Sequence, residues 1–350
     1  MTFTNKTRRQ FLRHVFIGSG VLALSGRPSR NVFAEDTSEG MAQQRLPGEV
    51  WIATLSQHEI HTETSAQMVD RMLEEMQKVV QYQPDIVCLP ELFPNANIDS
   101  RLSVSDLAER PPGPITGKFA GFARKHQCYV ICPTYTKEDG NIYNAAVVID
   151  RTGGILGEYR KIHPTESEIA KGVMPGRLDP PVFQTDFGTI GIQICFDIQW
   201  DDGWNSLEAH GAEIVFWPSA FAGGDMVNIR AWKQGYCMVS STNKDTSKIC
   251  NVAGQQIAGT GRWNPHHICA PVNLETAFLH TWPYVKRFPE IEAKYGRKVN
   301  ITNFHEEEWS IIESRPPDVK VADILKEFDL KTMHEHLRSA EQAQNQVRPV

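Results

Sequence analysis

The sequence has no run of about eighteen consecutive apolar residues, the length from which a membrane-spanning helix is expected. It also has no excess of basic residues, because 36 Lys and Arg stand against 42 Asp and Glu and the formal net charge is −6. Proteins that bind nucleic acid generally concentrate positive charge on one face. The composition therefore predicts neither a transmembrane helix nor a nucleic-acid partner.

The cysteines follow no disulfide or metal-binding pattern. There are seven, an odd number, and no Cys-x-x-Cys pair. Cys128 and Cys132 are four residues apart in an apolar stretch, where a strand would place both on one face as small core residues. His266, His267 and Cys269 lie close together, but no second cluster completes the four ligands of a structural zinc site. We therefore expect no bound metal, and the cysteines need not be paired.

The N-terminal 34 residues differ in character from the rest of the chain. Arg8 and Arg9 are adjacent, and a moderately apolar stretch follows over residues 15–24. This segment resembles a twin-arginine export signal, although a basic N-terminal arm is the alternative. Val32 and Ala34 frame a plausible cleavage site whose exact position stays open. The sequence predicts a signal peptide over 1–34, a polar linker over 35–47, and an exported, periplasmic protein that is soluble after cleavage.

From residue 48 onward, short apolar strand patterns alternate with helical ones. Met68, Met72 and Met76 recur at helical spacing within 65–82, which predicts a helix with a core-facing stripe. Alternation of this kind favours an α/β layered domain, here over 48–285. The other predicted strands are 49–55, 85–89, 128–133, 144–150, 212–218 and 239–243, with helices at 116–126 and 228–235 and a hairpin over 251–263. Residues 286–350 are more highly charged and predict a C-terminal extension without an apolar stripe wide enough for a domain of its own.

A single cysteine follows one of the buried strand patterns. Ile190, Ile192 and Ile194 alternate with smaller or polar residues, so the run would deliver Cys195 to the end of a strand. A rigid strand holds a nucleophilic thiol in place, and the N–H of the next residue, Phe196, can point at a developing oxyanion. The alternative for an isolated cysteine in such a run is a buried core residue.

Two further polar residues follow strand patterns. Pro90 ends the strand predicted over 85–89, so that Glu91 emerges beyond it, where burial raises the proton affinity of a general base. Lys161 comes after another strand pattern and a glycine turn. Each alone could be an ordinary surface residue.

Together, the segments LPELF around Glu91, YRKIH around Lys161 and ICFDIQW around Cys195 resemble the three signature blocks of the nitrilase superfamily of carbon–nitrogen hydrolases. The resemblance covers roughly residues 48–284 and implies a four-layer α-β-β-α sandwich. It implies that Glu91 is the general base, that Lys161 stabilises the tetrahedral intermediate, and that Cys195 is the nucleophile. Many members carry a second active-site glutamate, for which Glu166 and Glu168 are both candidates and Glu168 has the preferred spacing.

The resemblance also predicts the type of reaction. True nitrilases of the superfamily tend to have Trp-Glu after the cysteine, whereas this chain has Phe196 and Asp197, which favours the amidase and carbamoylase branches. We expect hydrolysis of an amide or N-carbamoyl small molecule through a thioester, without a cofactor. Nitrile hydrolysis, acyl transfer and a catalytically silent site are the alternatives.

Other residues are predicted to surround the substrate or to build an oligomer. Phe93, Trp200 and Phe221 lie near the three blocks in sequence and are candidate substrate contacts. C-terminal tails in this superfamily often pack on a neighbouring subunit, so we expect a homo-oligomer, a dimer or larger.

Overall fold

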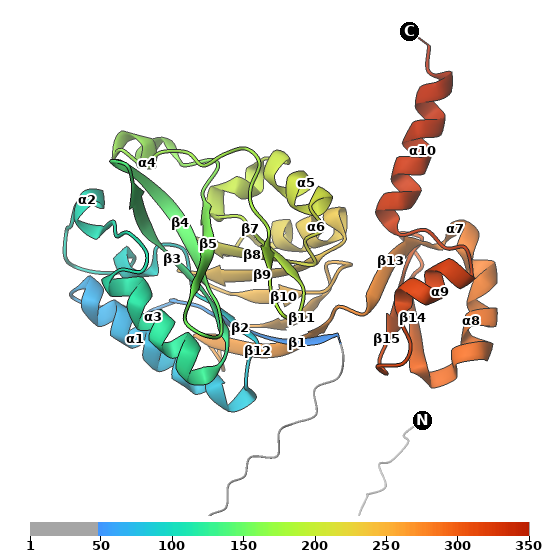
Figure 1. Ribbon diagram of the computed structural model, residues 1–350, viewed down its shortest axis with the longest axis horizontal. Coiled ribbons are helices and arrows are strands. Elements are labelled where there is room, and N and C mark those ends of the chain that lie inside the picture. The colour runs from blue at the N-terminus through green and yellow to red at the C-terminus, as the bar shows by residue number, and fades with distance from the viewer. Residues whose placement is uncertain (1–47, 350) are drawn as a thin grey trace, which may run out of the picture. The chain divides into compact units, whose positions relative to one another are not determined.

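The computed structural model describes residues 48–349, and the predicted signal peptide and linker lie outside this part of the chain. Two six-stranded sheets face each other, and helices cover the outer side of each (Figure 1). This arrangement confirms the predicted four-layer α-β-β-α sandwich. Within residues 48–349, no helix combines the length and the apolar character needed to cross a bilayer.

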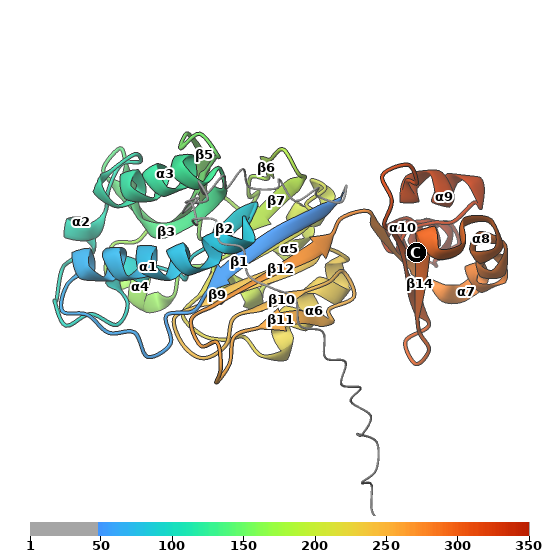
Figure 2. The same cartoon turned by 90° about the horizontal axis from the view of Figure 1, so that it is seen from below.

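The first sheet has the order β12-β1-β2-β3-β4-β5. Strands β1, β2 and β3 are parallel, while the other neighbours pair antiparallel. Helices α1 (Ser65–Val79) and α3 (Pro114–His126) lie side by side over its outer face (Figure 1 and Figure 2). The predicted methionine stripe of α1 is fully buried there. The strands are β1 (Glu49–Leu55), β2 (Ile86–Cys88), β3 (Tyr129–Glu138), β4 (Asn141–Ile149), β5 (Ile155–Arg160) and β12 (His267–Asn273).

The second sheet has the order β11-β10-β9-β8-β7-β6. Its central strands β7, β8 and β9 are parallel, and α5 (Asp202–Ala209) and α6 (Asp225–Gln234) cover its outer face (Figure 1). Trp204 and Trp217 are fully buried in that layer. The predicted hairpin is the pair β10–β11, which begins earlier than expected. The strands are β6 (Phe183–Gln184), β7 (Thr189–Ile192), β8 (Ile214–Ser219), β9 (Cys237–Thr242), β10 (Lys248–Cys250) and β11 (Gln256–Gly259).

The two sheets are joined by an apolar layer and by hydrogen bonds between β1 and β9. The Thr54 hydroxyl donates to the carbonyl of Ser240 at 2.7 Å, and the Ser241 hydroxyl donates to the carbonyl of Leu55 at 2.7 Å. Buried hydroxyls must find such partners, so these bonds fix the relative position of the two sheets. The segments that leave β2, β7, β8 and β9 consequently meet at one edge of the sandwich.

The C-terminal region contributes a further cluster of buried apolar side chains. Strands β13 (Thr276–His280), β14 (Val299–Phe304) and β15 (Trp309–Ser314) make a three-stranded sheet. Side chains of this sheet and of α8 and α9 pack together and are buried. The apolar residues are divided among short strands and helices and form no single stripe, and the described residues 48–349 belong to one compact unit. The helices are α7 (Thr281–Tyr284), α8 (Phe288–Tyr295), α9 (Val321–Glu327) and α10 (Met333–Val347).

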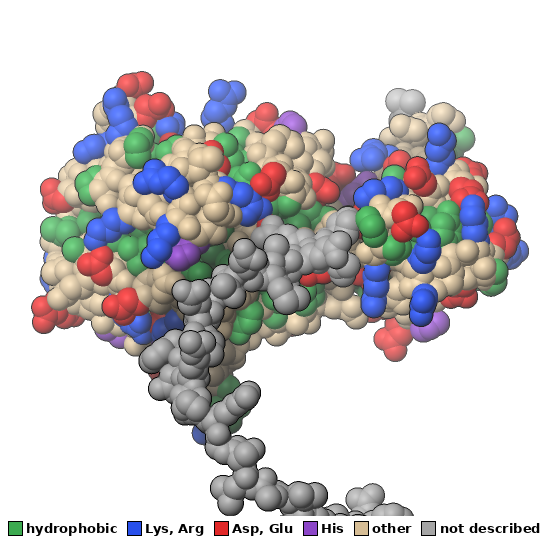
Figure 3. Space-filling model, turned by 60° about the horizontal axis from the view of Figure 1, so that its bottom comes forward, with side chains coloured by type: hydrophobic (Ala, Val, Ile, Leu, Met, Phe, Trp, Pro, Cys, Tyr) green, Lys and Arg blue, Asp and Glu red, His purple; other side chains and the backbone are tan. Residues whose placement is uncertain are grey.

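Basic and acidic side chains are interspersed over the face drawn in Figure 3. Several form pairs within or between surface helices, such as Lys118 of α3 with Asp70 of α1 and Lys233 of α6 with Asp201. Exposed pairs of this kind each contribute little to stability, typically less than about 1 kcal/mol.

A cluster of ion pairs around a buried carboxylate lies where α1 packs near the start of β12. The Glu75 side chain is fully buried, and it contacts Arg71, Lys78 and His267 at 2.5, 2.7 and 3.3 Å. Burial by itself raises the pKa of Glu75, but hydrogen bonds from His267 and Lys78 and the nearby positive charges outweigh it and lower the pKa to about 2. The ionised carboxylate is therefore the form that stabilises the fold.

We expect Glu75→Gln to lower the free energy of unfolding by about 2 to 3 kcal/mol near neutral pH. Because the pKa of Glu75 is depressed in the folded state, its contribution is complete above the ordinary value of 4.5 and disappears as pH falls toward 2. Urea unfolding at about pH 7 and about pH 4 measures the difference between wild type and variant. Glu74→Gln, one residue away and exposed, is the control and should change little. An equal effect at both pH values would contradict the prediction.

Candidate active site

Three charged side chains from separate elements meet in one buried group. Lys161 follows β5, and its Nζ lies 2.9 Å from Oε1 of Glu91 and 2.9 Å from Oε2 of Glu168. The Lys161 side chain is 2% exposed. Asn144 of β4 donates from Nδ2 to both carboxylates, at 2.8 Å to Glu91 and 2.7 Å to Glu168. These four hydrogen bonds join Glu91, Asn144, Lys161 and Glu168 into one network, so each of these side chains holds the others in position.

The structure brings Glu168 to Lys161 and leaves Glu166 exposed. Glu168 belongs to the first turn of α4 (Glu166–Ala170), where the Thr165 hydroxyl caps the helix and the Glu168 carboxylate accepts from the Thr165 N–H at 2.8 Å. This capping box fixes the side chain at the helix start. The short helix therefore determines which of the two candidate glutamates reaches the lysine.

The carboxylates keep the lysine charged. Burial by itself lowers the pKa of Lys161, but the charges of Glu91 and Glu168 and the hydrogen bond to Glu168 outweigh it, so the pKa is raised well above its ordinary value. Burial raises the pKa of Glu168, whereas Lys161 and the hydrogen bonds from Thr165 and Asn144 lower it more, and the net shift is downward. Lys161 is therefore a permanent positive charge in a site largely closed to water.

Cys195 lies near this group in a strained turn. Strand β7 ends at Ile192, three residues earlier than the predicted strand end, and Cys195 begins a 3₁₀ turn with φ of 46°. A left-handed conformation is unfavourable for a residue with a side chain and commonly marks functional sites. The carbonyl of Cys195 accepts from Nε1 of Trp217 at 3.0 Å. The thiol is consequently presented from a sharp, fixed bend.

The thiol is neutral at ordinary pH. Burial and the negative charge of Glu91 raise the pKa of Cys195 to about 12, and the opposing effects of Lys161 and the Ala220 N–H do not cancel them. Glu91 and the Cys195 thiol line the same cavity. A carboxylate there is a candidate to receive the thiol proton, which matters because a neutral thiol is a poor nucleophile.

Glu91, Lys161, Glu168 and Cys195 line one cavity of about 290 Å³. This volume lies near the lower end of the range for small-molecule sites, about 300–1,000 Å³. The remaining lining residues come from the segments after β2, β8 and β9 and from β3 and the turn before α4. They are Leu92, Asn95, Ala96, Tyr135, Thr165, Ala220 and Asn243.

The three predicted substrate contacts do not line this cavity. Phe93 is fully buried and packs edge-to-face on Phe119 in the core beneath α1 and α3, with ring centroids 5.2 Å apart, so its prediction was wrong. Trp200 stacks on His163, with centroids 4.2 Å apart, and Phe221 packs edge-to-face on Trp217. An aromatic residue that lies close in sequence to a reactive residue can point either into the cavity or into the core. In a short loop, the periodicity of the sequence does not distinguish these two orientations.

Phe196 occupies the position after the cysteine, as the sequence requires, and its ring packs edge-to-face on Trp200 with centroids 4.8 Å apart. Asp197, whose identity favours the amidase branch, also fixes this turn. Its buried carboxylate accepts from the Ile194 N–H at 2.8 Å and from the Tyr159 hydroxyl at 2.6 Å. An acidic residue inside an otherwise apolar segment was the available signal for it.

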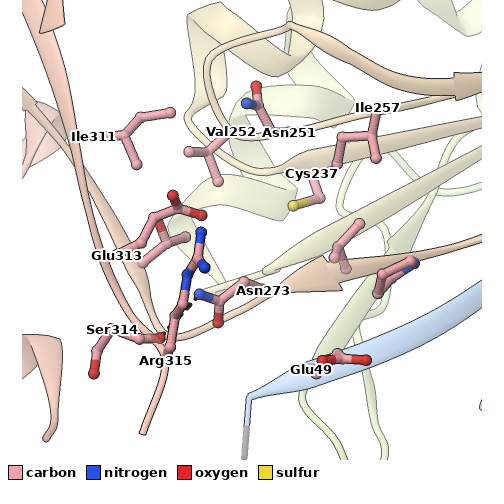
Figure 4. A pocket seen from close by; sticks show the side chains of 13 residues that line it. Glu49, Cys237, Asn251, Val252, Ile257, Asn273, Ile311, Glu313, Ser314 and Arg315 are labelled. Carbon is pink, nitrogen blue, oxygen red and sulfur yellow. Dashed lines mark hydrogen bonds between the residues drawn. The ribbon is translucent and has the colours of Figure 1, made fainter. Parts of the chain in front are cut away.

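Another cavity, of about 360 Å³, lies apart from the one at Cys195, and none of the predicted site residues line it (Figure 4). Residues of β12, the β10–β11 turn and β15 line it, among them Asn273, Glu313 and Arg315. It shares no lining residue with the cavity at Cys195.

Comparison with known sequences identifies one matching family and several curated relatives. The family model described as carbon-nitrogen hydrolase matches residues 52–277. A nitrilase from Pyrococcus abyssi is 34% identical over 136 residues, which cover 38% of this chain and 51% of that protein. A beta-ureidopropionase from Arabidopsis thaliana is 27% identical over 227 residues, which cover 61% of this chain and 55% of that protein. The chain thus spans about half the length of these curated relatives.

Solved structures agree on the fold. An amidase from Nesterenkonia sp. has a TM-score of 0.56 and 19% identity, covering 72% of this chain and 97% of that one. Nit3 from Saccharomyces cerevisiae, a member of branch 10 of the nitrilase superfamily, has a TM-score of 0.56 and 18% identity, covering 72% of this chain and 96% of that one. Since the family match extends over more than half of the sequence, the chain belongs to the carbon–nitrogen hydrolase family.

Proposed function

We propose that this protein hydrolyses the C–N bond of an amide or N-carbamoyl small molecule through a thioester on Cys195. The observation that carries the proposal is the common cavity: the buried Glu91–Lys161–Glu168 group and the Cys195 thiol line the same space of about 290 Å³. A base, a fixed positive charge and a nucleophile within one small cavity are the components that acyl transfer requires.

In the proposed reaction, Glu91 takes the proton of the Cys195 thiol as sulfur attacks the carbonyl carbon. The Nζ of Lys161 and the N–H of Phe196 stabilise the oxyanion of the tetrahedral intermediate. The C–N bond then breaks, and the protonated Glu91 returns the proton to the leaving ammonia or amine. Water activated by Glu91 attacks the thioester, and the acid and the free thiol are released.

Glu168 is proposed to act through Lys161. It binds the same Nζ as Glu91, both carboxylates accept from the Asn144 amide, and together they orient the ammonium group. The two carboxylates leave Lys161 little freedom to move away from the proposed oxyanion. Holding a charged group in place before the reaction is the main way in which it stabilises a transition state.

The amide and N-carbamoyl classes are favoured over nitriles because Phe196 and Asp197 follow the cysteine in place of Trp-Glu. The relatives named above include a beta-ureidopropionase and also a nitrilase, so nitrile hydrolysis is the second candidate. Both reactions use the same nucleophile and differ in the bond to which the thiol adds, the C=O bond of an amide or the C≡N bond of a nitrile.

Ammonia release from a panel of aliphatic amides, N-carbamoyl amino acids and nitriles, followed together with the intact mass of the protein, tests the proposal. We expect turnover of at least one amide or N-carbamoyl compound and an acyl adduct of the corresponding mass. Turnover of nitriles alone would favour the second candidate, and hydroxamate formed with added hydroxylamine but no acid formed in water would indicate acyl transfer. A folded protein that releases no ammonia and forms no adduct would contradict the proposal.

A further inference from the structure

We propose that Asn95 is a specificity-determining residue, which binds a second, uncharged polar group of the substrate such as a carboxamide or ureido group. This inference rests on the proposed function, because it concerns the same cavity. The proposed function names the bond that is cleaved, and this inference names the chemical class of a second group elsewhere in the substrate.

The side-chain amide of Asn95 has no partner in the described structure. Both its Nδ2 and its Oδ1 are buried and make no hydrogen bond to residues 48–349, and Asn95 lines the cavity at Cys195. An amide deprived of water and of hydrogen bonds costs on the order of a hydrogen bond per atom. Since both atoms lack partners, the group offers one donor side and one acceptor side in either orientation of the amide.

Hydrogen bonds fix the backbone around Asn95 and therefore the position from which its side chain leaves the chain. Asn95 ends the 3₁₀ turn Phe93–Asn95, and its N–H donates to the carbonyl of Leu92 at 2.8 Å. The buried amide of Gln57 donates to the carbonyls of Phe93 and Ala96, at 3.1 and 2.9 Å, on either side of Asn95. Asn243 lines the same cavity, and its Oδ1 is also buried without a partner among the described residues, while its Nδ2 donates to the carbonyl of Glu91. The unpaired amide therefore belongs to a rigid part of the cavity wall.

The charges of the cavity select against an anionic substrate. Among the described residues that line it, there is no arginine or histidine, and the one lysine, Lys161, is already paired with Glu91 and Glu168. A substrate carboxylate would find no free cation there and would lie near two carboxylates, which repel it. An uncharged group that both donates and accepts hydrogen bonds matches the free atoms of Asn95 and Asn243.

The kinetic test compares straight-chain dicarboxamides from malonamide to adipamide with the monoamide of the same chain length. We expect wild type to prefer the dicarboxamide, in kcat/KM, at one chain length at least. The ratio of dicarboxamide to monoamide kcat/KM should fall by about tenfold to a hundredfold in Asn95→Ala. It should also fall in Asn95→Asp, which keeps the shape of the side chain but has no donor when ionised. A ratio that stays the same in both variants would overturn the inference.

Binding separates failure of this inference from failure of the proposed function. In the Cys195→Ala background, calorimetric titration with the same compounds requires no turnover. We expect tighter binding of one dicarboxamide than of its monoamide, and loss of that preference in Cys195→Ala/Asn95→Ala. If wild type hydrolyses no amide but the preference in binding is present, the hydrolytic proposal fails and the assignment of Asn95 stands. If neither binding nor kinetics distinguishes dicarboxamide from monoamide, the assignment is overturned. Thermal unfolding of each variant confirms that it folds.

Discussion

Ammonia release is expected to fall by at least about a thousandfold when Cys195 is replaced by alanine, and the acyl adduct seen by mass spectrometry should disappear. The carboxylates of Glu91 and Glu168 are not expected to replace the thiol, because they are held by Lys161 and Asn144 and cannot reach a substrate carbonyl without breaking those bonds. The protein itself should fold, since alanine fits within the space of the cysteine and tolerates the same backbone about as well.

Cys269→Ala is the matched control for this prediction. Cys269 lies on β12, is partly exposed and does not line the cavity, so its removal should leave turnover within about twofold of wild type. An adduct that persists in Cys195→Ala and is lost in Cys269→Ala would show that the nucleophile has been assigned to the wrong cysteine.

Replacement of Lys161 by methionine is expected to have the second largest effect, on both activity and stability. The change leaves Glu91 and Glu168 buried beside each other without a cation, which typically costs about 3 to 5 kcal/mol in the free energy of unfolding. It also removes the positive charge that the proposed oxyanion requires, so turnover should fall by at least about a hundredfold to a thousandfold. Urea unfolding and ammonia release measure the two effects separately.

The loss of stability in Lys161→Met should depend on pH. Two carboxylates that share a buried site cannot both ionise easily, so the pKa of one of them rises above its value in the unfolded chain. A carboxyl group with a raised pKa in the folded state stabilises the fold below the unfolded value, and that contribution disappears as pH rises. The variant should therefore be closer to wild type in stability at about pH 5 than at about pH 8.

Two further variants serve as controls for the lysine. Lys161→Met/Glu168→Gln has one carboxylate fewer and should recover part of the stability but none of the activity. Lys233→Met removes an exposed lysine that pairs with Asp201 on the surface, and should cost less than about 1 kcal/mol. Full activity in Lys161→Met at a pH where the variant is folded would contradict the assigned role of Lys161.

Much of the fold could be predicted because strand and helix patterns are local. The strand over 49–55 and the stripe of Met68, Met72 and Met76 lie where the sequence indicated, since both depend on spacing along one element. The C-terminal cluster of buried apolar side chains could not be predicted in this way. Its apolar side chains come from β13, β15, α8 and α9, and their proximity depends on pairing between distant strands.

The candidate site shows the same division. Glu91, Lys161 and Cys195 could be found from three short segments, and the structure brings all three to one cavity. The hydrogen bonds of Asn144 and Asp197 could not be predicted from the sequence, because they depend on which side chain lies opposite, and that is set by tertiary packing. Phe93 was mistaken for the opposite reason: its place in the sequence is next to the site, whereas its ring points into the core.

The buried thiols bear on how this protein survives oxidation. Sulfenic acid and mixed disulfides form from exposed thiolates, and burial raises the pKa of Cys88, Cys128, Cys132, Cys237, Cys250 and Cys269 above the ordinary value. Burial and the charge of Glu91 likewise raise the pKa of Cys195, to about 12. Because neutral thiols react slowly with peroxide and disulfide reagents, we expect these seven cysteines to be oxidised more slowly than exposed thiolates.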